Sequence, residues 1–265
     1  MIKMNDEHLI VVGTGIRTVG QLSMESLAWI KTADKVLYVA SDPIAEEVIM
    51  ALNPEGAESM AHFYGENKQR TETYRQMVEH VMANLRAGRR VCFAVYGHPG
   101  VLVSPTHEAI RRARAEGFKA RMLPAISTED CLFADLGVDP VSGCQSLEAT
   151  DFLSNLRYID PHGHVLLWQI GGLGDPTFKR YSFDVRGMPQ LVRKLMRYYP
   201  PHHLVHLYEA AIFPGVEPAI HSGPLHYLAQ IRPMSNSTLY IPPVSAPFPD
   251  PAAWWGPSGV AGVRE

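Results

Sequence analysis

Residues 90–100 of this 265-residue chain read RVCFAVYGHPG. The run Val91–Val95 is short and almost entirely apolar, as is typical of a strand buried on both faces of a parallel sheet. It ends abruptly at a Gly-His-Pro-Gly turn. Ligands of parallel α/β sheets bind beyond the carboxyl ends of the strands, so we expect the residues after Val95 to face a ligand.

The sequence on either side of this strand predicts repeated β–α alternation. Apolar residues spaced three and four apart predict a helix before the strand, ending near Gly88. Such alternation indicates a mostly parallel sheet with helices on its faces. The other strands and helices expected in this half are strands Leu9–Val12, Val36–Val39 and Lys119–Leu123, and helices after Ser23, at Ile44–Leu52 and at Thr106–Glu116.

The second half of the chain predicts another α/β domain. Ser127 or Thr128 is expected to cap a helix with acidic residues in its first turn, where the helix dipole favours them. A change in composition after this point places the domain boundary near Ala125. The elements expected beyond it are strands Val165–Ile170, Leu204–Tyr208 and Ser237–Ile241, and a helix near residues 191–198. The predicted domains are residues 1–125 and 126–243, with a Pro, Gly and Trp-rich tail at 244–265.

Composition narrows the classes of function. A hydrophobic content of 46% suffices for a sizeable core, and a net charge of −3 gives no electrostatic reason to bind nucleic acid or an anionic membrane. There is neither a signal peptide nor an apolar run of about 18 residues. The three cysteines, Cys92, Cys131 and Cys144, are too scattered for a disulfide framework or a zinc site. We therefore expect a cytoplasmic protein.

Two further motifs are weak when taken alone. Gly13, Gly15 and Gly20 suggest a dinucleotide loop, but Thr18 stands where the third glycine is needed, so a tight turn and a ligand loop both stay open. His202 and His206 would share a helix face, yet the residues around them predict a strand. We therefore predict no metal site.

The segment HFYGENKQRTETY, residues 62–74, is the second candidate for a site. Arg70 and Tyr74 are four residues apart and share a helix face, while Tyr64 lies just upstream. An arginine at a helix N-terminus gains nothing from the helix dipole, which favours a functional role, although a solvated arginine stays open. In the YGHPG turn, Tyr96 and His98 converge with Ser104 at a strand end, unless the turn is only structural.

The ordered set of GTG, YGHPGV, PAISTEDCLFADLG, LLWQIG, LYEA and STLYIPP resembles the tetrapyrrole methylase superfamily, which uses S-adenosylmethionine. Together with YGHPGV, the segment HFYGENKQRTETYRQM resembles the borosin peptide backbone α-N-methyltransferases of that superfamily. The likeness covers about residues 8–243. It implies a two-domain α/β fold with a mostly parallel N-terminal sheet, a mixed C-terminal sheet and S-adenosylmethionine bound in the cleft between the domains.

The resemblance also implies the site. The catalytic set carried over by motif is Tyr64, Arg70, Tyr74 and Tyr96. The residues expected to line the cofactor are Tyr96, His98, Val101, Ser104, Ser127, Gln169, Ala210, Ser237 and Thr238. Arg70 is expected to lower the pKa of Tyr74, so that its phenolate removes the proton of a substrate amide while Tyr64 or Tyr96 donates to the carbonyl oxygen.

Two departures from the family pattern matter. Ala125 stands where the family has glycine, and only a short tail follows Ile241, whereas fused members carry a clasp and a core peptide there. The chain therefore resembles a split member that methylates a separately encoded precursor peptide. In the tail, GVAGV resembles a core peptide on a short tether, and Trp254 and Trp255 are read as a packing anchor or partner contact.

The function expected from the sequence is S-adenosylmethionine-dependent N-methylation of backbone amides in a ribosomal precursor peptide. The resemblance implies a homodimer, or a heterotetramer with two precursors. Two alternatives stay open: a small-molecule methylase that acts on a precorrin-type tetrapyrrole, and a non-catalytic partner that binds the cofactor and captures a leader peptide.

Overall fold

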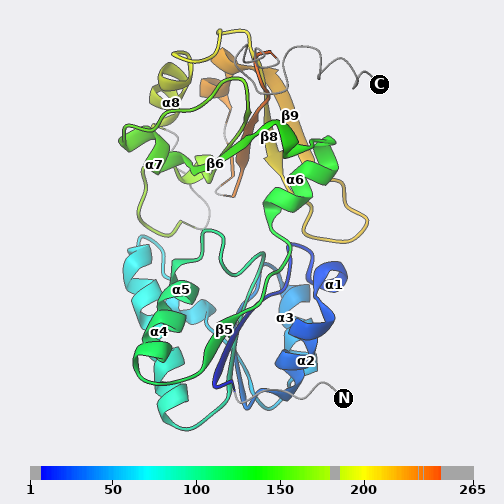
Figure 1. Ribbon diagram of the computed structural model, residues 1–265, viewed down its shortest axis with the longest axis vertical. Coiled ribbons are helices and arrows are strands. Elements are labelled where there is room, and N and C mark those ends of the chain that lie inside the picture. Colours follow the sequence, from blue (N-terminus) through cyan, green and yellow to red (C-terminus); the bar gives the residue numbers. More distant parts are fainter. Residues whose placement is uncertain (1–6, 180–185, 232, 235, 246–265) are drawn as a thin grey trace, which may run out of the picture. The chain divides into compact units, whose positions relative to one another are not determined.

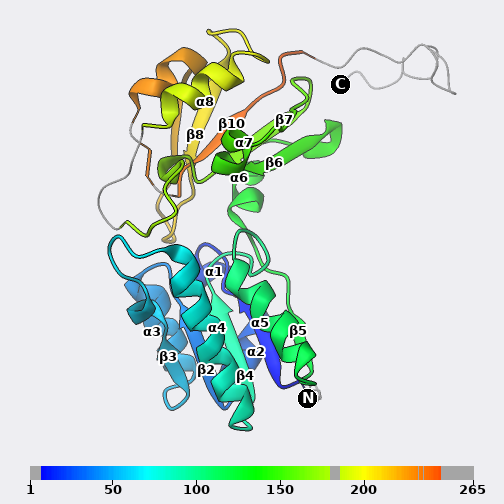
Figure 2. The same cartoon turned by 90° about the vertical axis from the view of Figure 1, so that its left-hand side faces the viewer.

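The computed structural model describes residues 7–179, 186–231, 233–234 and 236–245, and its elements are labelled in Figures 1 and 2. The chain forms two compact units, neither of which is contiguous in sequence. The first contains residues 1–139, 174–184 and 208–220, and the second contains 140–173, 185–207 and 221–265.

The first unit is built on a five-stranded sheet of order β3-β2-β4-β1-β5. All four strand pairs in it are parallel, as the sequence predicted. Because β4 lies in the middle of the sheet, all five of its residues are buried. The strands are β1 (Leu9–Gly13), β2 (Lys35–Val39), β3 (Ala57–Ser59), β4 (Val91–Val95) and β5 (Ala120–Met122).

Helices cover both faces of this sheet because alternate strand residues point to opposite sides. Leu9 and Val11 pack with α4 and α5, whereas Ile10 and Val12 pack with α2 and α3. Figure 2 shows α4 and α5 lying along one side of the strands. The helices are α1 (Thr18–Gln21), α2 (Met24–Thr32), α3 (Pro43–Leu52), α4 (Arg70–Arg86), α5 (Ser104–Ala115) and α6 (Thr128–Leu136), with a short 3-10 turn η1 (Ala61–Phe63).

The strand order creates a topological switch point between β1 and β4. The chain leaves β1 toward α2 on one face of the sheet and leaves β4 toward α5 on the other. The two loops begin side by side, with the Thr14 N–H donating to the Val95 carbonyl at 2.9 Å and the Gly97 N–H donating to the Gly15 carbonyl at 2.8 Å. Ligands of open α/β sheets bind at such points.

Gly13 is required where these loops meet. A Cβ at this position would lie 2.1 Å from the Gly97 carbonyl oxygen and 2.5 Å from the Ala125 Cβ. The first of these contacts is with backbone, which cannot rotate away. The glycine therefore allows the two loops to approach each other. The sequence motif is compatible with a tight turn here, but it does not predict the contact with Gly97.

The second unit contains most of a sheet of order β6-β7-β10-β8-β9, in which the end of β8 and the start of β9 belong to the first unit. β6 and β7 are parallel and β7 and β10 are antiparallel, so the sheet is mixed, as predicted. Phe152 of α7 and Leu191 of α8 lie in its core with the inward residues of β7 and β10. The strands are β6 (Cys144–Glu148), β7 (His164–Trp168), β8 (Leu204–Glu209), β9 (Ala219–Pro224) and β10 (Thr238–Ile241); the helices are α7 (Ala149–Ser154) and α8 (Met188–Leu195), and the 3-10 turns are η2 (Pro140–Ser142), η3 (Ile170–Gly172) and η4 (Leu225–Gln230).

The units differ from the contiguous domains expected at 1–125 and 126–243. The first unit continues past Ala125 through α6, and residues 174–184 and 208–220 return to it. One contact that ties a returning segment to α6 is the Tyr208 hydroxyl, which donates to the Asp135 carboxylate at 2.6 Å. Most of the predicted tail, including Trp254 and Trp255, lies outside the described residues.

Two findings concern the described residues as a whole. Within them, no helix is both long enough and apolar enough to cross a membrane. The same residues contain no group of three or more His, Cys, Asp or Glu side chains able to hold a metal ion. His206 lies on strand β8, as the sequence predicted.

We expect Gly13→Ala to destabilise the chain by about 3 kcal/mol, because the new methyl group overlaps the Gly97 carbonyl oxygen. The change should lower the thermal unfolding midpoint, and adding Ala125→Gly should not restore it, because the carbonyl contact remains. Gly20→Ala is the matched control, since a Cβ there meets nothing within 4 Å. A Gly13→Ala midpoint equal to that of the wild type would contradict the close approach of the two loops.

Candidate functional site

The loop after β4 is held in place by its own side chains. The Gly100 N–H donates to Nδ1 of His98 at 2.9 Å, and the Thr106 hydroxyl donates to the Pro99 carbonyl at 2.5 Å. His98 therefore braces the turn by accepting this hydrogen bond at Nδ1. Tyr96 stands exposed at the start of the loop, with its N–H bonded to the Val39 carbonyl at 3.2 Å.

Lys68 links the segment before α4 to that helix. Lys68 Nζ donates to the Phe63 carbonyl at 2.5 Å and to Oε1 of Gln76 at 2.6 Å. Arg70 is the first residue of α4, and Tyr74 lies one turn further on the same helix, so the prediction that they share a helix face is confirmed. Tyr64 is half-buried and packs against the core of the first unit.

The structure brings Arg70 and the three tyrosines together. Burial raises the pKa of Tyr64, which the nearby Tyr74 and Tyr96 raise further and Arg70 lowers. Loss of water around the phenol raises the pKa of Tyr74 and also that of Tyr96, although Tyr96 as a whole residue is 47% exposed, and in both cases Arg70 acts in the opposite direction. Arg70 therefore lies close enough to influence the ionisation of all three tyrosines, and Tyr74 close enough to influence that of Tyr64 and Tyr96.

The expected direction of the Tyr74 pKa is wrong. The sequence argument had Arg70 lower it below its ordinary value of 10.0, whereas the net shift is upward. Arg70 does act as predicted, but the loss of water around the phenol disfavours phenolate more strongly. All three phenols are therefore neutral hydrogen-bond donors at neutral pH.

Two other first-unit residues have local roles. The Ser127 hydroxyl accepts from the Asp130 N–H at 3.4 Å and the Asp130 carboxylate accepts from the Ser127 N–H at 2.7 Å, so Ser127 caps α6 as predicted. Ser104 opens α5 and is exposed. Of the other cofactor residues predicted in this unit, Val101 is exposed and Ala210 directly follows β8.

The remaining predicted cofactor residues belong to the second unit. Gln169 follows β7, and the next N–H, that of Ile170, donates to the Ser237 carbonyl at 3.2 Å, which joins the ends of β7 and β10. Ser237 and Thr238 are fully buried. The Thr238 hydroxyl is buried without a hydrogen-bond partner among the described residues.

Backbone conformation marks the same segments independently. Among the described residues, the non-glycine residues with positive φ are Asn67 at 62°, Leu102 at 56° and Gln169 at 57°. Each lies in a segment selected above, and such conformations cost roughly 1–3 kcal/mol and gather at functional sites. No sequence signal predicts the positive φ of Leu102 and Gln169. The positive φ of Asn67 is less unexpected, because asparagine is often found in the left-handed region.

Sequence reasoning also missed a contact across the chain. The ring of Phe178 lies 4.9 Å from that of Tyr64, and residues 67–70 pair with residues 176–178. No local pattern could have found this contact, because the two segments are more than a hundred residues apart.

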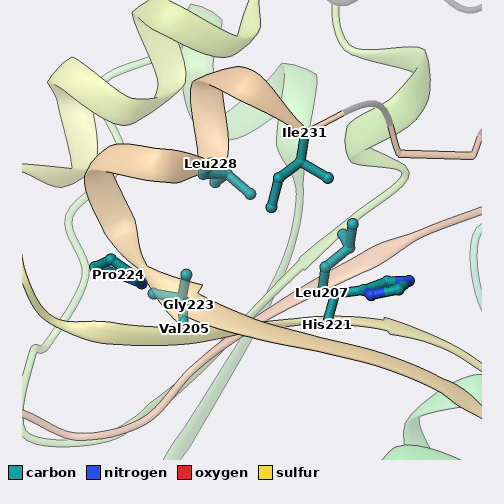
Figure 3. Close-up of a pocket in the computed structure, with 7 residues that line it drawn as sticks. All are labelled: Val205, Leu207, His221, Gly223, Pro224, Leu228 and Ile231. Atoms are coloured by element: carbon teal, nitrogen blue, oxygen red, sulfur yellow. The ribbon is translucent and has the colours of Figure 1, made fainter.

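A small hollow in the second unit is separate from these residues. It is lined mainly by apolar side chains of β8, β9 and η4, and Figure 3 shows His221 turned away from Leu228 and Ile231. None of the predicted site residues lines it. The lining residues are Val205, Leu207, His221, Gly223, Pro224, Leu228 and Ile231.

The parallel sheet, its switch point and the polar loops beside it define an α/β protein of the class that binds ligands at the strand ends. The profile of the Tetrapyrrole (Corrin/Porphyrin) Methylases matches residues 8–216. The chain belongs to this family.

Its relatives by sequence include long fungal proteins. It is 41% identical over 240 residues to the methyltransferase/ribosomally synthesized cyclic peptide dendrothelin A precursor of Dendrothele bispora, covering 89% of this chain and 57% of that protein. It is 40% identical over 243 residues to the corresponding omphalotin A precursor of Omphalotus olearius, with the same coverage. The chain thus spans little more than half the length of these relatives.

Solved structures share the fold. A uroporphyrin-III-C-methyltransferase from Thermus thermophilus superposes with a TM-score of 0.63 at 18% identity, covering 90% of this chain and 93% of that one. Cobalt precorrin-4 methyltransferase gives 0.63 at 14% identity, covering 88% and 94%. A further structure of the Thermus enzyme, with TM-score 0.58 and 18% identity over 89% and 92%, is a complex with S-adenosyl homocysteine.

We expect Tyr74 to ionise above its ordinary pKa of 10.0, because burial outweighs the effect of Arg70. Arg70→Gln should raise the pKa further by removing the opposing charge. The measurement is the ultraviolet absorbance of phenolate during alkaline titration, taken as wild type minus Tyr74→Phe. Arg75→Gln, on an exposed arginine of the same helix, is the control and should leave the midpoint unchanged. Ionisation of Tyr74 below pH 10 would show that the burial argument is wrong.

Proposed function

We propose that this chain transfers methyl groups from S-adenosylmethionine to backbone amide nitrogens of a ribosomal peptide. The observation that carries the proposal is the grouping of Arg70 with Tyr64, Tyr74 and Tyr96 beside the loop after β4. Support for the substrate class comes from the sequence relatives, which are named as methyltransferases joined to ribosomally synthesized peptide precursors.

A peptide amide requires this kind of assistance. Its nitrogen lone pair is delocalised into the carbonyl group, which makes the nitrogen a poor nucleophile. As the nitrogen becomes nucleophilic, negative charge gathers on the carbonyl oxygen and the N–H proton must leave. A site for this reaction therefore needs donors for the oxygen and a base for the proton.

The neutral phenols and the guanidinium are suited to stabilise the negative charge on the substrate's carbonyl oxygen. A phenol with a pKa above 10 can donate a hydrogen bond without losing its proton, and Arg70 supplies a permanent positive charge beside the tyrosines. We assign Tyr64 or Tyr96 to the carbonyl oxygen and retain Tyr74 as the base. Fewer than about one phenol in 10³ is ionised at pH 7 when the pKa exceeds 10, so the base is present as a small, strongly basic fraction.

The residues proposed for the methyl donor fit its chemistry. When bound, S-adenosylmethionine supplies an electrophilic methyl group on a sulfonium cation. Among the described residues the buried Thr238 hydroxyl has no hydrogen-bond partner, so a polar ligand placed beside it would satisfy it, and Val101 and Ala210 offer apolar surface for a base ring. We propose that these residues hold it together with Tyr96, His98, Ser104, Ser127, Gln169 and Ser237.

The alternative of a tetrapyrrole substrate rests on the family alone, because structures at 18% identity or less show the fold and nothing further. The sequence relatives at about 40% identity favour a peptide. The separate precursor, the homodimer and the cytoplasmic location expected from the sequence stay predictions.

We expect Tyr74→Phe and Arg70→Gln, made separately, to reduce peptide methylation by about 10²-fold or more, because each removes a group that acts on the amide. The chain is co-expressed with the peptide encoded beside its gene, and methyl groups are located on backbone nitrogen by tandem mass spectrometry. Binding of S-adenosylmethionine, measured by calorimetry, should stay within a few fold of wild type.

Tyr158→Phe is the control for these variants, because Tyr158 is 78% exposed and lies in the other unit. Wild-type rates in either test variant would show that the assigned residue has no catalytic role. Methyl groups on residues 246–265 of the chain itself, with none on the added peptide, would contradict the separate precursor. Methylation of uroporphyrinogen alone would favour the tetrapyrrole alternative.

We expect the methylation rate to increase with pH from 7 to 9, by about tenfold per unit, because the raised pKa of Tyr74 keeps the phenolate fraction small throughout this range. Single-turnover rates with saturating peptide and S-adenosylmethionine give the profile. A rate that is flat over this range would exclude Tyr74 phenolate as the base and leave the tyrosines only as donors.

A further inference from the structure

Residues 174–179, here called the strap, reach the first unit from a distant part of the sequence. They follow β7 and η3, which belong to the second unit, yet Gly174 begins a segment of the first. Three backbone hydrogen bonds join the strap to residues 67–70: Asn67 N–H to the Phe178 carbonyl at 3.0 Å, Phe178 N–H to the Lys68 carbonyl at 2.9 Å, and Arg70 N–H to the Pro176 carbonyl at 3.1 Å.

The third of these bonds replaces a helix cap. The first N–H groups of a helix have no partner within the helix and usually bond to a capping side chain. At α4 the N-cap residue is Gln69, whose side chain makes no such bond. The Pro176 carbonyl instead accepts from Arg70, the first helical residue. The point where α4 begins, and with it the position of Arg70, therefore depends on the strap.

The strap also contacts Tyr64. The rings of Phe178 and Tyr64 are 4.9 Å apart and inclined at 42°, a favourable geometry for an aromatic pair. Lys179 Nζ also donates to Oδ1 of Asn67, the residue whose backbone is left-handed. The strap therefore contacts the surroundings of both Arg70 and Tyr64, two of the four predicted catalytic residues.

The strap is itself preorganised. Oδ1 of Asp175 accepts from the Thr177 N–H at 2.8 Å and from the Thr177 hydroxyl at 2.6 Å, and Pro176 between them has a fixed φ. Burial opposes ionisation of Asp175, but hydrogen bonds from Thr177 and the charges of Lys179 and Arg70 lower its pKa. The strap therefore presents a carboxylate in the field of Arg70 as well as a rigid backbone.

We infer that the strap sets the position of Arg70 and Tyr64 for methyl transfer, with Phe178 as a positioning residue. The effect on the rate rests on the proposed function, whereas the contacts of the strap do not depend on it. A displacement of about 1 Å at a catalytic group can cost about 10²-fold in rate, so loosening the strap should reduce turnover without removing any group that touches the substrate.

The test compares Phe178→Leu with Phe178→Tyr and with a matched control. Phe178→Leu removes the ring and should lower kcat for methylation of the co-expressed peptide by about tenfold to 10²-fold, with the KM for S-adenosylmethionine within about twofold of wild type. Phe178→Tyr keeps the ring pair and should restore kcat to within about threefold. Phe118→Leu is the control: Phe118 is also half-buried and pairs with His8, and it lies just before β5, away from the strand ends that carry the site.

Amide hydrogen exchange separates this inference from the proposed function. In the Phe178→Leu variant the N–H groups of Arg70 and of residue 178 should lose protection from exchange, while those in the middle of α4 keep it. This measurement does not require the protein to be active. If the wild type methylates no peptide, the proposed function fails while exchange still tests the strap. Unchanged exchange together with unchanged kcat would overturn the inference, as would equal loss of protection throughout the first unit, which would indicate a purely structural role.

Discussion

The approach of the Gly97 carbonyl to Gly13 fixes the position of the candidate site in the first unit. The loops that follow β1 and β4 lead to helices on opposite faces of the sheet, so they diverge beyond the carboxyl ends of these strands. They nevertheless stay in contact where they begin, because Gly13 has no side chain. Tyr96 is attached directly to Gly97, and Ser127 follows two residues after Ala125, which also packs on Gly13. A single missing methyl group thus locates the tyrosine and the capped end of α6 relative to β1.

The sequence predicted the central elements well because they carry the strongest patterns. β1, β2 and β4 are apolar runs buried in the middle of their sheet, and Ser127 with Asp130 is a recognisable capping box. β3, β6 and β9 were not predicted. They lie at sheet edges, and Ala57–Ser59 is too short, and Cys144–Glu148 and Ala219–Pro224 too polar, to show a period.

The site was predictable only where its geometry is local. The shared helix face of Arg70 and Tyr74 follows from a spacing of four. Tyr96 and Tyr64 were placed with them by family resemblance, and the pairing of residues 67–70 with the strap follows from neither. The predicted direction of the Tyr74 pKa shift was wrong because burial, which depends on how the chain packs, outweighs the charge of Arg70. Such effects belong to the fold rather than to any motif.

Burial and charge act against each other on these phenols, and the balance bears on how the site works. Burial keeps Tyr64, Tyr74 and Tyr96 protonated, while Arg70 favours their ionised forms. A bound peptide would expel more water, which disfavours phenolate further but also strengthens the field of Arg70 by lowering the local dielectric. Under the proposed function the two effects grow together, so the guanidinium offsets part of the loss of the basic form that burial causes. The position of Arg70 at the start of α4, where its N–H donates to the Pro176 carbonyl, is consistent with that role.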